Sequence, residues 1–101
     1  MSTDRPHDRI DEVIHQRTRL AIMAALAGVE SLDFNELKAD LALTDGNLST
    51  HATALEHAGY VKITKTFRGK KPLTSLAMTA KGRKALASYV AALQTILDMA
   101  R

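Results

Sequence analysis

Small polar and nearly uncharged residues recur between positions 44 and 58 of the sequence. They are Thr44, Gly46, Asn47, Ser49, Thr50, Thr53 and His57. An ordinary solvated helix surface would favour Lys and Glu instead. The Asn side chain can bond adenine in a bidentate way, Ser and Thr can bond base edges or phosphates, and Thr methyl groups can meet thymine methyls. The pattern favours contact with DNA, and the alternative is a merely polar surface helix.

A second group of candidate residues is cationic. Residues 60–97 carry eight Lys or Arg and no acid, whereas residues 1–59 carry five cations and ten acids, an asymmetry hidden in the net charge of +3. Such a block of cations is expected on a surface that binds a polyanion. The candidate contacts to the DNA backbone or minor groove are Lys65, Arg68, Lys70 and Lys71. The alternative is a hairpin tip that is charged only for solubility.

Catalytic and metal-binding arrangements are missing from the sequence. There is no Cys, which excludes a disulfide, a thiolate metal site and a cysteine nucleophile. Ser49 and His51 would project about 200° apart on a helix, where they cannot meet. The four histidines lack a metal-ligand spacing; they are His7, His15, His51 and His57. We therefore expect no enzyme activity, no cofactor and no metal.

Length and composition set the scale of the fold. The 101 residues suit one domain, and 46% hydrophobic with 25% charged residues is typical of globular proteins. No apolar stretch is long enough to cross a bilayer, and the polar N-terminus does not resemble a signal peptide. We expect a cytoplasmic protein without membrane contact, with a flexible leader over residues 1–9 and one domain over residues 10–101.

The first half of the chain reads as helical. Apolar residues at three- and four-residue steps predict helix from Ile10 to Gly28, either one long helix or two abutting ones. A short extended segment at residues 31–34 precedes a second helix capped by Asp33 or Asn35. Thr44 can cap a third helix that ends at Gly59. The connection between the second and third helices is very short, which predicts a helix-turn-helix.

On the third helix, Leu48, Ala52 and Leu55 share the face expected to pack inward. His51 lies about 60° from the centre of that face, which favours a structural brace over base contact.

In the second half of the chain, the period of the apolar residues changes. Alternating residues 60–67 and residues 73–78 predict two strands joined by a basic turn at 68–72, and Thr79 caps a helix over residues 80–100. The expected fold is mainly α, of the α+β type: a winged helix-turn-helix with a two-stranded β-wing and a C-terminal dimerisation helix.

The last helix carries more apolar surface than one small core needs, so a dimer interface is expected on it rather than burial within the monomer. Its apolar stripe consists of Leu86, Tyr89, Val90, Leu93, Ile96 and Leu97.

Three segments in order resemble the winged-helix part of ArsR- and MarR-type bacterial regulators. They are Arg17–Leu26, which is similar to a "TRLxILxxL" pattern, Thr44–Val61, and Met78–Arg83, which is similar to "LTxxGR". The "GNLSxH" and "KxFxGxxP" motifs of a compact group match Gly46–His51 and Lys65–Pro72. The resemblance implies DNA binding and a bacterial or archaeal, nucleoid-associated location. It also implies that the terminal helix pairs with Ile10, Val13 and Ile14 in a dimer.

These observations favour a homodimeric transcriptional regulator, most simply a repressor, that reads an inverted repeat with residues 44–58 in the major groove and residues 60–78 on the backbone or minor groove. Metal-sensing ArsR proteins use Cys motifs, and typical MarR proteins have additional helices that build a ligand pocket. This sequence has neither feature, so the resemblance gives no basis for a metal or small-molecule effector. The alternative is a winged-helix protein-interaction module without sequence-specific DNA binding.

Overall fold

The computed structural model describes residues 5–101 and confirms the winged helix-turn-helix. The elements are the 3-10 helix η1 (Pro6–Arg9), α1 (Arg17–Ala27), β1 (Leu32–Asp33), α2 (Phe34–Asp40), α3 (Asp45–His57), β2 (Val61–Arg68), β3 (Lys71–Met78) and α4 (Ala80–Met99). The strands form one antiparallel sheet in the order β1-β3-β2. Over the described residues, no helix is long and apolar enough to span a membrane.

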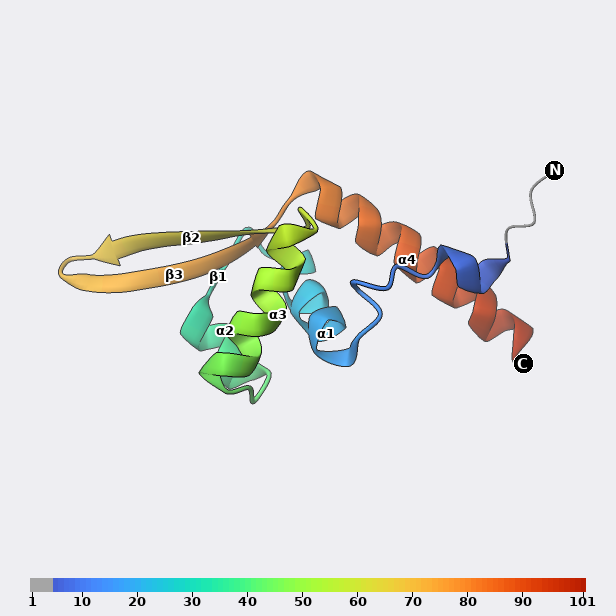
Figure 1. Ribbon diagram of the computed structural model, residues 1–101, viewed down its shortest axis with the longest axis horizontal. Coiled ribbons are helices and arrows are strands. Elements are labelled where there is room, and N and C mark those ends of the chain that lie inside the picture. The colour runs from blue at the N-terminus through green and yellow to red at the C-terminus, as the bar shows by residue number, and fades with distance from the viewer. Residues whose placement is uncertain (1–4) are drawn as a thin grey trace.

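Two arms project in opposite directions from a small helical body (Figure 1). One arm is the β2–β3 hairpin, which we call the wing, and the other is α4 with η1 beside it. The molecule measures 57 × 26 × 22 Å with a radius of gyration of 15.3 Å. A compact domain of this length would have a radius of gyration of about 13 Å. The excess comes from the arms, which therefore expose surface that the body does not cover.

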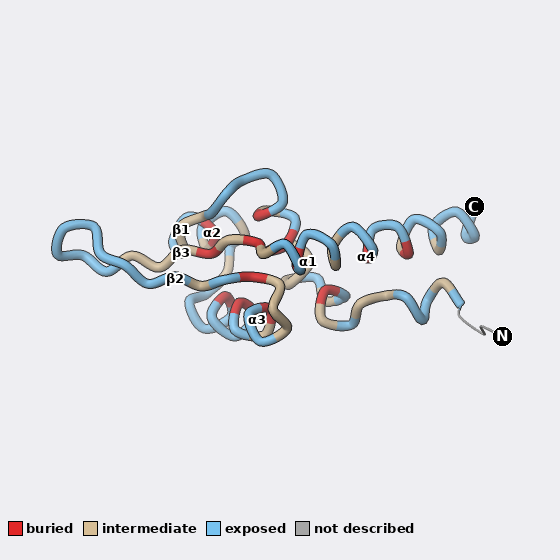
Figure 2. Tube along the Cα trace, turned by 90° about the horizontal axis from the view of Figure 1, so that it is seen from above, coloured by how far each residue is buried: buried red, intermediate tan, exposed pale blue. Residues whose placement is uncertain are grey.

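The core lies where α1, α2, α3 and the base of the sheet meet, and it extends to Ile14 before α1 and to Tyr89 of α4 (Figure 2). Its large, fully buried side chains are Ile14, Ile22, Met23, Leu26, Leu37, Leu48, Leu55, Leu76 and Tyr89. The three α3 residues expected to face inward are buried, which confirms the predicted orientation of that helix.

The helix predicted from Ile10 is wrong over its first seven residues, because α1 begins at Arg17. The Asp11 carboxylate accepts hydrogen bonds from the backbone amides of Val13 and Ile14 at 2.9 and 3.2 Å, which holds a turn instead. Gln16 then caps α1 through its side chain. Within the expected leader, Pro6–Arg9 forms η1 against α4, and residues 1–4 lie outside the described residues.

The turn between α2 and α3 ends α2 in a tight Schellman arrangement. The Ala42 amide bonds the Ala39 carbonyl and the Leu43 amide bonds the Lys38 carbonyl. Ala42 has a φ of 53°, a left-handed conformation that Gly usually adopts at this position. This turn sets the angle between the two helices of the helix-turn-helix.

The wing and α4 begin side by side. The Thr79 hydroxyl donates to the Gly59 carbonyl at 2.6 Å and accepts from the Gly82 amide at 2.9 Å, which confirms it as the cap of α4. A Cβ at Gly82 would lie 2.1 Å from the Tyr60 carbonyl oxygen. Only glycine allows α4 to approach the start of β2 this closely.

Candidate nucleic-acid interface

The outer face of α3 is exposed at every position that the sequence singled out. Those positions are Thr44, Gly46, Asn47, Ser49, Thr50, Thr53 and His57. Thr44 also has a structural task, because its hydroxyl accepts the Asn47 amide at 3.1 Å and caps the helix. The side chains of Asn47 and Thr50 stand on the first two turns, which approach base edges most closely in helix-turn-helix docking.

The one acidic residue on the first turn of α3 is neutralised. Asp45 lies 2.7 Å from the Lys38 ammonium of α2, in an ion pair at the surface. Unpaired, this carboxylate would repel DNA phosphates near the end of α3 that is expected to read bases. The pair also ties the two helices of the helix-turn-helix together.

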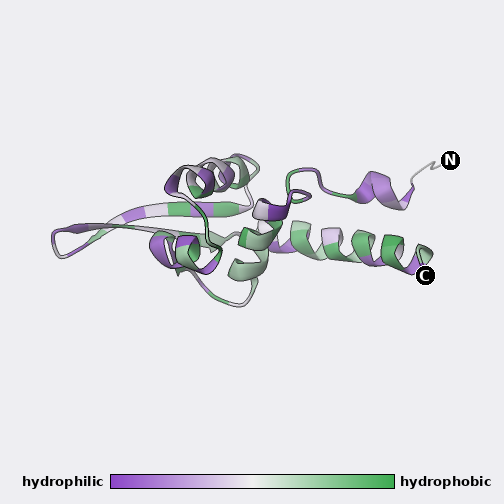
Figure 3. Cartoon of the chain, turned by 90° about the horizontal axis from the view of Figure 1, so that it is seen from below, coloured by the Kyte–Doolittle hydropathy of each residue, from purple (hydrophilic) through white to green (hydrophobic). Residues whose placement is uncertain are grey.

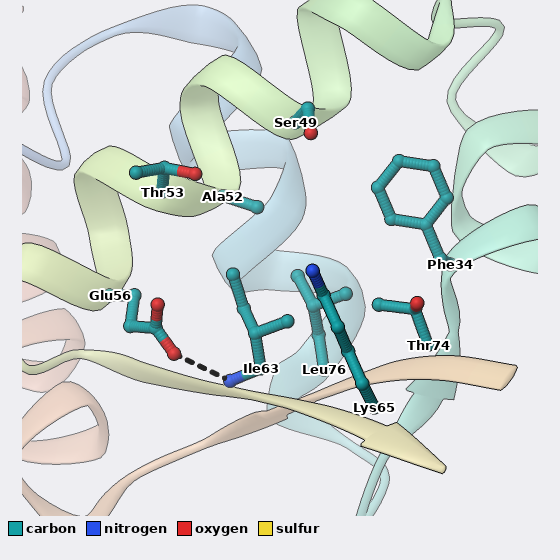
Figure 4. Close-up of a pocket in the computed structure, with 9 residues that line it drawn as sticks. All are labelled: Phe34, Ser49, Ala52, Thr53, Glu56, Ile63, Lys65, Thr74 and Leu76. Carbon is teal, nitrogen blue, oxygen red and sulfur yellow. Dashed lines mark hydrogen bonds between the residues drawn. The ribbon is translucent and has the colours of Figure 1, made fainter. Parts of the chain in front are cut away.

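A second acid on α3 is hydrogen-bonded to the wing. The Glu56 carboxylate accepts the backbone amide of Ile63 at 3.1 Å, on the edge of β2 that faces away from β3 (Figure 4). Its place in the sequence indicates only a surface residue; the side chain is exposed, but it also orients the wing. Beside this hydrogen bond lies a cleft of about 560 Å³, into which Ser49 and Thr53 of α3 and Lys65 of β2 point.

The wing carries its cations on an exposed hairpin. Lys65, Arg68, Lys70 and Lys71 are all exposed, as predicted. The strands pair from Val61↔Met78 to Arg68↔Lys71, so only Gly69 and Lys70 form the turn. Gly69 has a φ of 66°, the positive value that a two-residue hairpin needs at its first position. The basic turn is thus shorter and more sharply defined than expected.

His51 is half-buried and braces α3 from within. The Arg19 guanidinium of α1 donates to its Nδ1 at 3.2 Å and also bonds the Val13 carbonyl. The structural role predicted for His51 is confirmed, through a side chain of α1 rather than the backbone. Sequence spacing could not indicate Arg19, because the hydrogen bond joins residues 32 positions apart.

Further hydrogen bonds tie the segment before α1 to both arms. The Tyr60 hydroxyl, at the root of the wing, donates to the Asp11 carboxylate. This hydrogen bond, together with burial and the carboxylate charge, raises the pKa of Tyr60 to about 12. His15 shares a 2.9 Å hydrogen bond with the Tyr89 hydroxyl of α4. Neither pairing is indicated by any spacing in the sequence.

Helix α4 has two apolar faces with different environments. Tyr89 and Ala92 are buried against the chain, whereas Val90 and Leu97 are 53% and 51% exposed. Figure 3 shows hydrophobic residues along most of α4, although much of the helix is exposed in Figure 2. Ile14 and Tyr89, expected at a dimer interface, are buried within one chain and leave no side-chain surface for a partner. The remaining candidates are half-buried or exposed: Ile10, Val13, Leu86, Val90, Leu93, Ile96 and Leu97.

Within residues 5–101, no three His, Asp or Glu side chains gather in a way that could hold a metal ion. The polar surface of α3 and the cationic wing, joined by Glu56, are the features of this molecule best suited to a nucleic acid.

Known proteins share this architecture. The family described as "winged helix DNA-binding domain" matches residues 18–97. The uncharacterized protein MJ0432 of Methanocaldococcus jannaschii is 38% identical over 79 residues, which cover 78% of this chain and 86% of that protein. The transcriptional regulator homologue protein from Pyrococcus horikoshii superposes with a TM-score of 0.82 at 28% identity, over 87% of each chain.

A structure of overoxidized AbfR bound to DNA shares the fold, with a TM-score of 0.73 at 16% identity over 90% of this chain and 66% of AbfR. The finer assignment to an ArsR or MarR type stays a prediction. The family match covers the helix-turn-helix, the wing and nearly all of α4. The chain therefore belongs to the winged helix DNA-binding domain family.

Proposed function

We propose that this chain is a homodimeric transcriptional regulator that recognises an inverted repeat in double-stranded DNA. The observation that carries the proposal is the outer face of α3, whose predicted DNA-binding residues are all exposed and mostly small and polar. Side chains of this size allow a helix to lie deep in the major groove, where amide and hydroxyl groups meet base edges. The wing would then bind the backbone or the adjacent minor groove.

The open face of α4 supports the dimer. Leu86, Val90, Leu93 and Leu97 follow the alternating three- and four-residue spacing of a helix-pairing seam. Val90 and Leu97 are more than half exposed, and Leu86 and Leu93 are half-buried beside Tyr89. A two-fold axis along this seam would set two α3 helices into successive major grooves, about 34 Å apart. Repression by occupying a promoter is the simplest mode, and a cytoplasmic location follows from the partner.

Salt dependence separates this proposal from a protein-interaction module. We expect binding of the full chain to random duplex DNA to weaken linearly on a logarithmic salt scale, with a slope of about 0.9 per neutralised phosphate. Fluorescence anisotropy with a labelled duplex measures this slope. Binding that is absent at low salt would overturn the proposal and favour a protein partner.

A further inference from the structure

The proposed function leaves the most exposed large hydrophobic residue of the described chain without a role. Phe67 is 74% exposed, near the tip of the wing. The strand register places it directly opposite Pro72, which is exposed too. Cross-strand partners stand side by side on one face of a hairpin. The wing thus ends in an apolar pair rather than in a purely charged loop.

This apolar pair lies on the face of the wing that is turned toward α3. Ile63 and Lys65 of β2 line the cleft beside α3 and point into it (Figure 4). Alternate residues of a strand share a face, so Phe67 follows Lys65 on the same side. The face therefore runs from α3 through Lys65 and its neighbour Thr74 to the apolar pair.

The wing spans most of the distance between neighbouring grooves of DNA. Ile63 is held against α3 by Glu56, and Phe67 lies four residues farther, about 13 Å along the strand. Half a turn of B-DNA, from a major groove to the next minor groove, is about 17 Å. With α3 in the major groove, Lys65 and Thr74 would lie over the intervening backbone. Phe67 and Pro72 would then reach the minor groove.

We propose that Phe67 and Pro72 form an apolar wedge that enters the minor groove, partly unstacks a base step and bends the DNA. The inference rests on the proposed function, because it requires α3 in the major groove. Phe and Pro are among the side chains that minor-groove proteins insert between base steps. Three cations at the turn, Arg68, Lys70 and Lys71, with no acid on either strand, make DNA the matching partner rather than a protein surface.

The wedge also adds to sequence preference. Pyrimidine–purine steps unstack most easily, so a TA or CA step should be favoured about five base pairs from the bases that α3 reads. The preference would arise without any hydrogen bond to a base, through the lower energy needed to open that step.

A duplex with 2-aminopurine at this step and fluorophores at both ends tests the inference on the full chain. We expect wild type to raise the 2-aminopurine fluorescence and to bend the duplex. Phe67→Ala should lose both signals and bind several-fold more weakly with an unchanged salt slope. Phe67→Leu should keep part of each. Thr66→Ala, an exposed neighbour on the opposite face of β2, is the matched control and should behave as wild type.

The results separate the wedge from the proposed function. If wild type binds duplex DNA but neither bends it nor raises the fluorescence, or if Phe67→Ala bends it equally, the wedge is wrong and the proposed function stands. If wild type binds no duplex, both fail. Because Phe67 is 74% exposed, its loss should leave the melting temperature unchanged, so weakened binding cannot be ascribed to unfolding.

Discussion

The two arms of the molecule are built on opposite principles. The outer half of the wing is exposed and rich in cations, whereas α4 exposes large apolar side chains toward its C-terminus, where Val90, Leu97 and Met99 are all more than half exposed. Neither arm is stabilised by the core along its full length (Figure 2). Their difference suggests two different partners: a polyanion for the wing and a second apolar helix for α4.

The arms nevertheless share one root. Tyr60 begins the wing, its carbonyl accepts the Thr79 amide at 3.0 Å, and Gly82 of α4 packs against the same carbonyl. The Tyr60 hydroxyl donates a hydrogen bond to Asp11 in the segment before α1. A shift of α4 in the proposed dimer would therefore displace the base of the wing, which makes the shared root the place to test how the arms depend on each other.

The largest effect should come from placing charge on the open face of α4. We expect Val90→Asp with Leu97→Asp to convert the proposed dimer to a monomer, because two carboxylates of each chain would have to be buried at the seam. A monomer can hold only one half-site, so DNA affinity should fall by about 10²–10⁴-fold. Sedimentation and anisotropy measure the two changes. Ser88→Asp, exposed on another face of α4, should remain dimeric, and monomeric wild type would refute the seam.

Removing the charge of the wing should weaken binding to all duplexes about equally. In the triple variant Arg68→Ala, Lys70→Ala and Lys71→Ala, the salt slope should fall by about one unit for each phosphate that is no longer neutralised. Dimerisation should not change, since α4 is untouched. An unchanged slope would show that the tip is merely solvated and that another surface binds the backbone.

The shared root is tested by substituting Gly82, with Gly46 of α3 as the matched control. Gly82→Ala should lower the free energy of unfolding by about 3 kcal/mol, because the new methyl group would overlap the Tyr60 carbonyl. Gly46→Ala has open space around it and should raise stability by up to about 1 kcal/mol through helix propensity. Urea denaturation measures both. Equal stability of the two variants would mean that α4 is not held closely at its root.

Base reading is assigned to α3 and should be separable from the affinity of the wing. Asn47→Ala or Thr50→Ala should cost about 1–3 kcal/mol on a cognate site and little on random DNA, with the fold intact. By contrast, Leu48→Ala should cost about 2–5 kcal/mol of folding stability, because its side chain is fully buried. If both polar variants lose equally on cognate and random DNA, another element reads the sequence.

The smallest effect concerns pH. The folded pKa of Tyr60, about 12, lies above its ordinary value of 10, so this hydroxyl contributes stability below pH 10 that is lost as pH rises toward 12. Tyr60→Phe should therefore show a shallower loss of unfolding free energy between pH 10 and pH 12, measured by denaturant titration at several pH values. Parallel losses would argue against the hydrogen bond to Asp11.

Local signals in the sequence predicted the elements that carry the candidate site. The threonines Thr44 and Thr79 mark helix starts through their hydroxyls, and period-two alternation marks the wing, so α3, β2, β3 and α4 lie within one or two residues of expectation. The helix predicted around Ile14 is wrong because the apolar residues there have helical spacing, whereas the Asp11 carboxylate closes a turn. The hydrogen bond between Glu56 and Ile63 depends on how α3 and β2 pack against each other. The periodicity of apolar residues along the sequence does not indicate such packing.

We propose that two copies of this chain, joined along α4, read DNA with two α3 helices. Selection of bound duplexes from a random pool, at a concentration where sedimentation shows the dimer, tests it most directly. We predict an inverted repeat with half-site centres about 10 base pairs apart, or a multiple of that spacing. A single unrepeated motif, or no enriched sequence, would contradict the account.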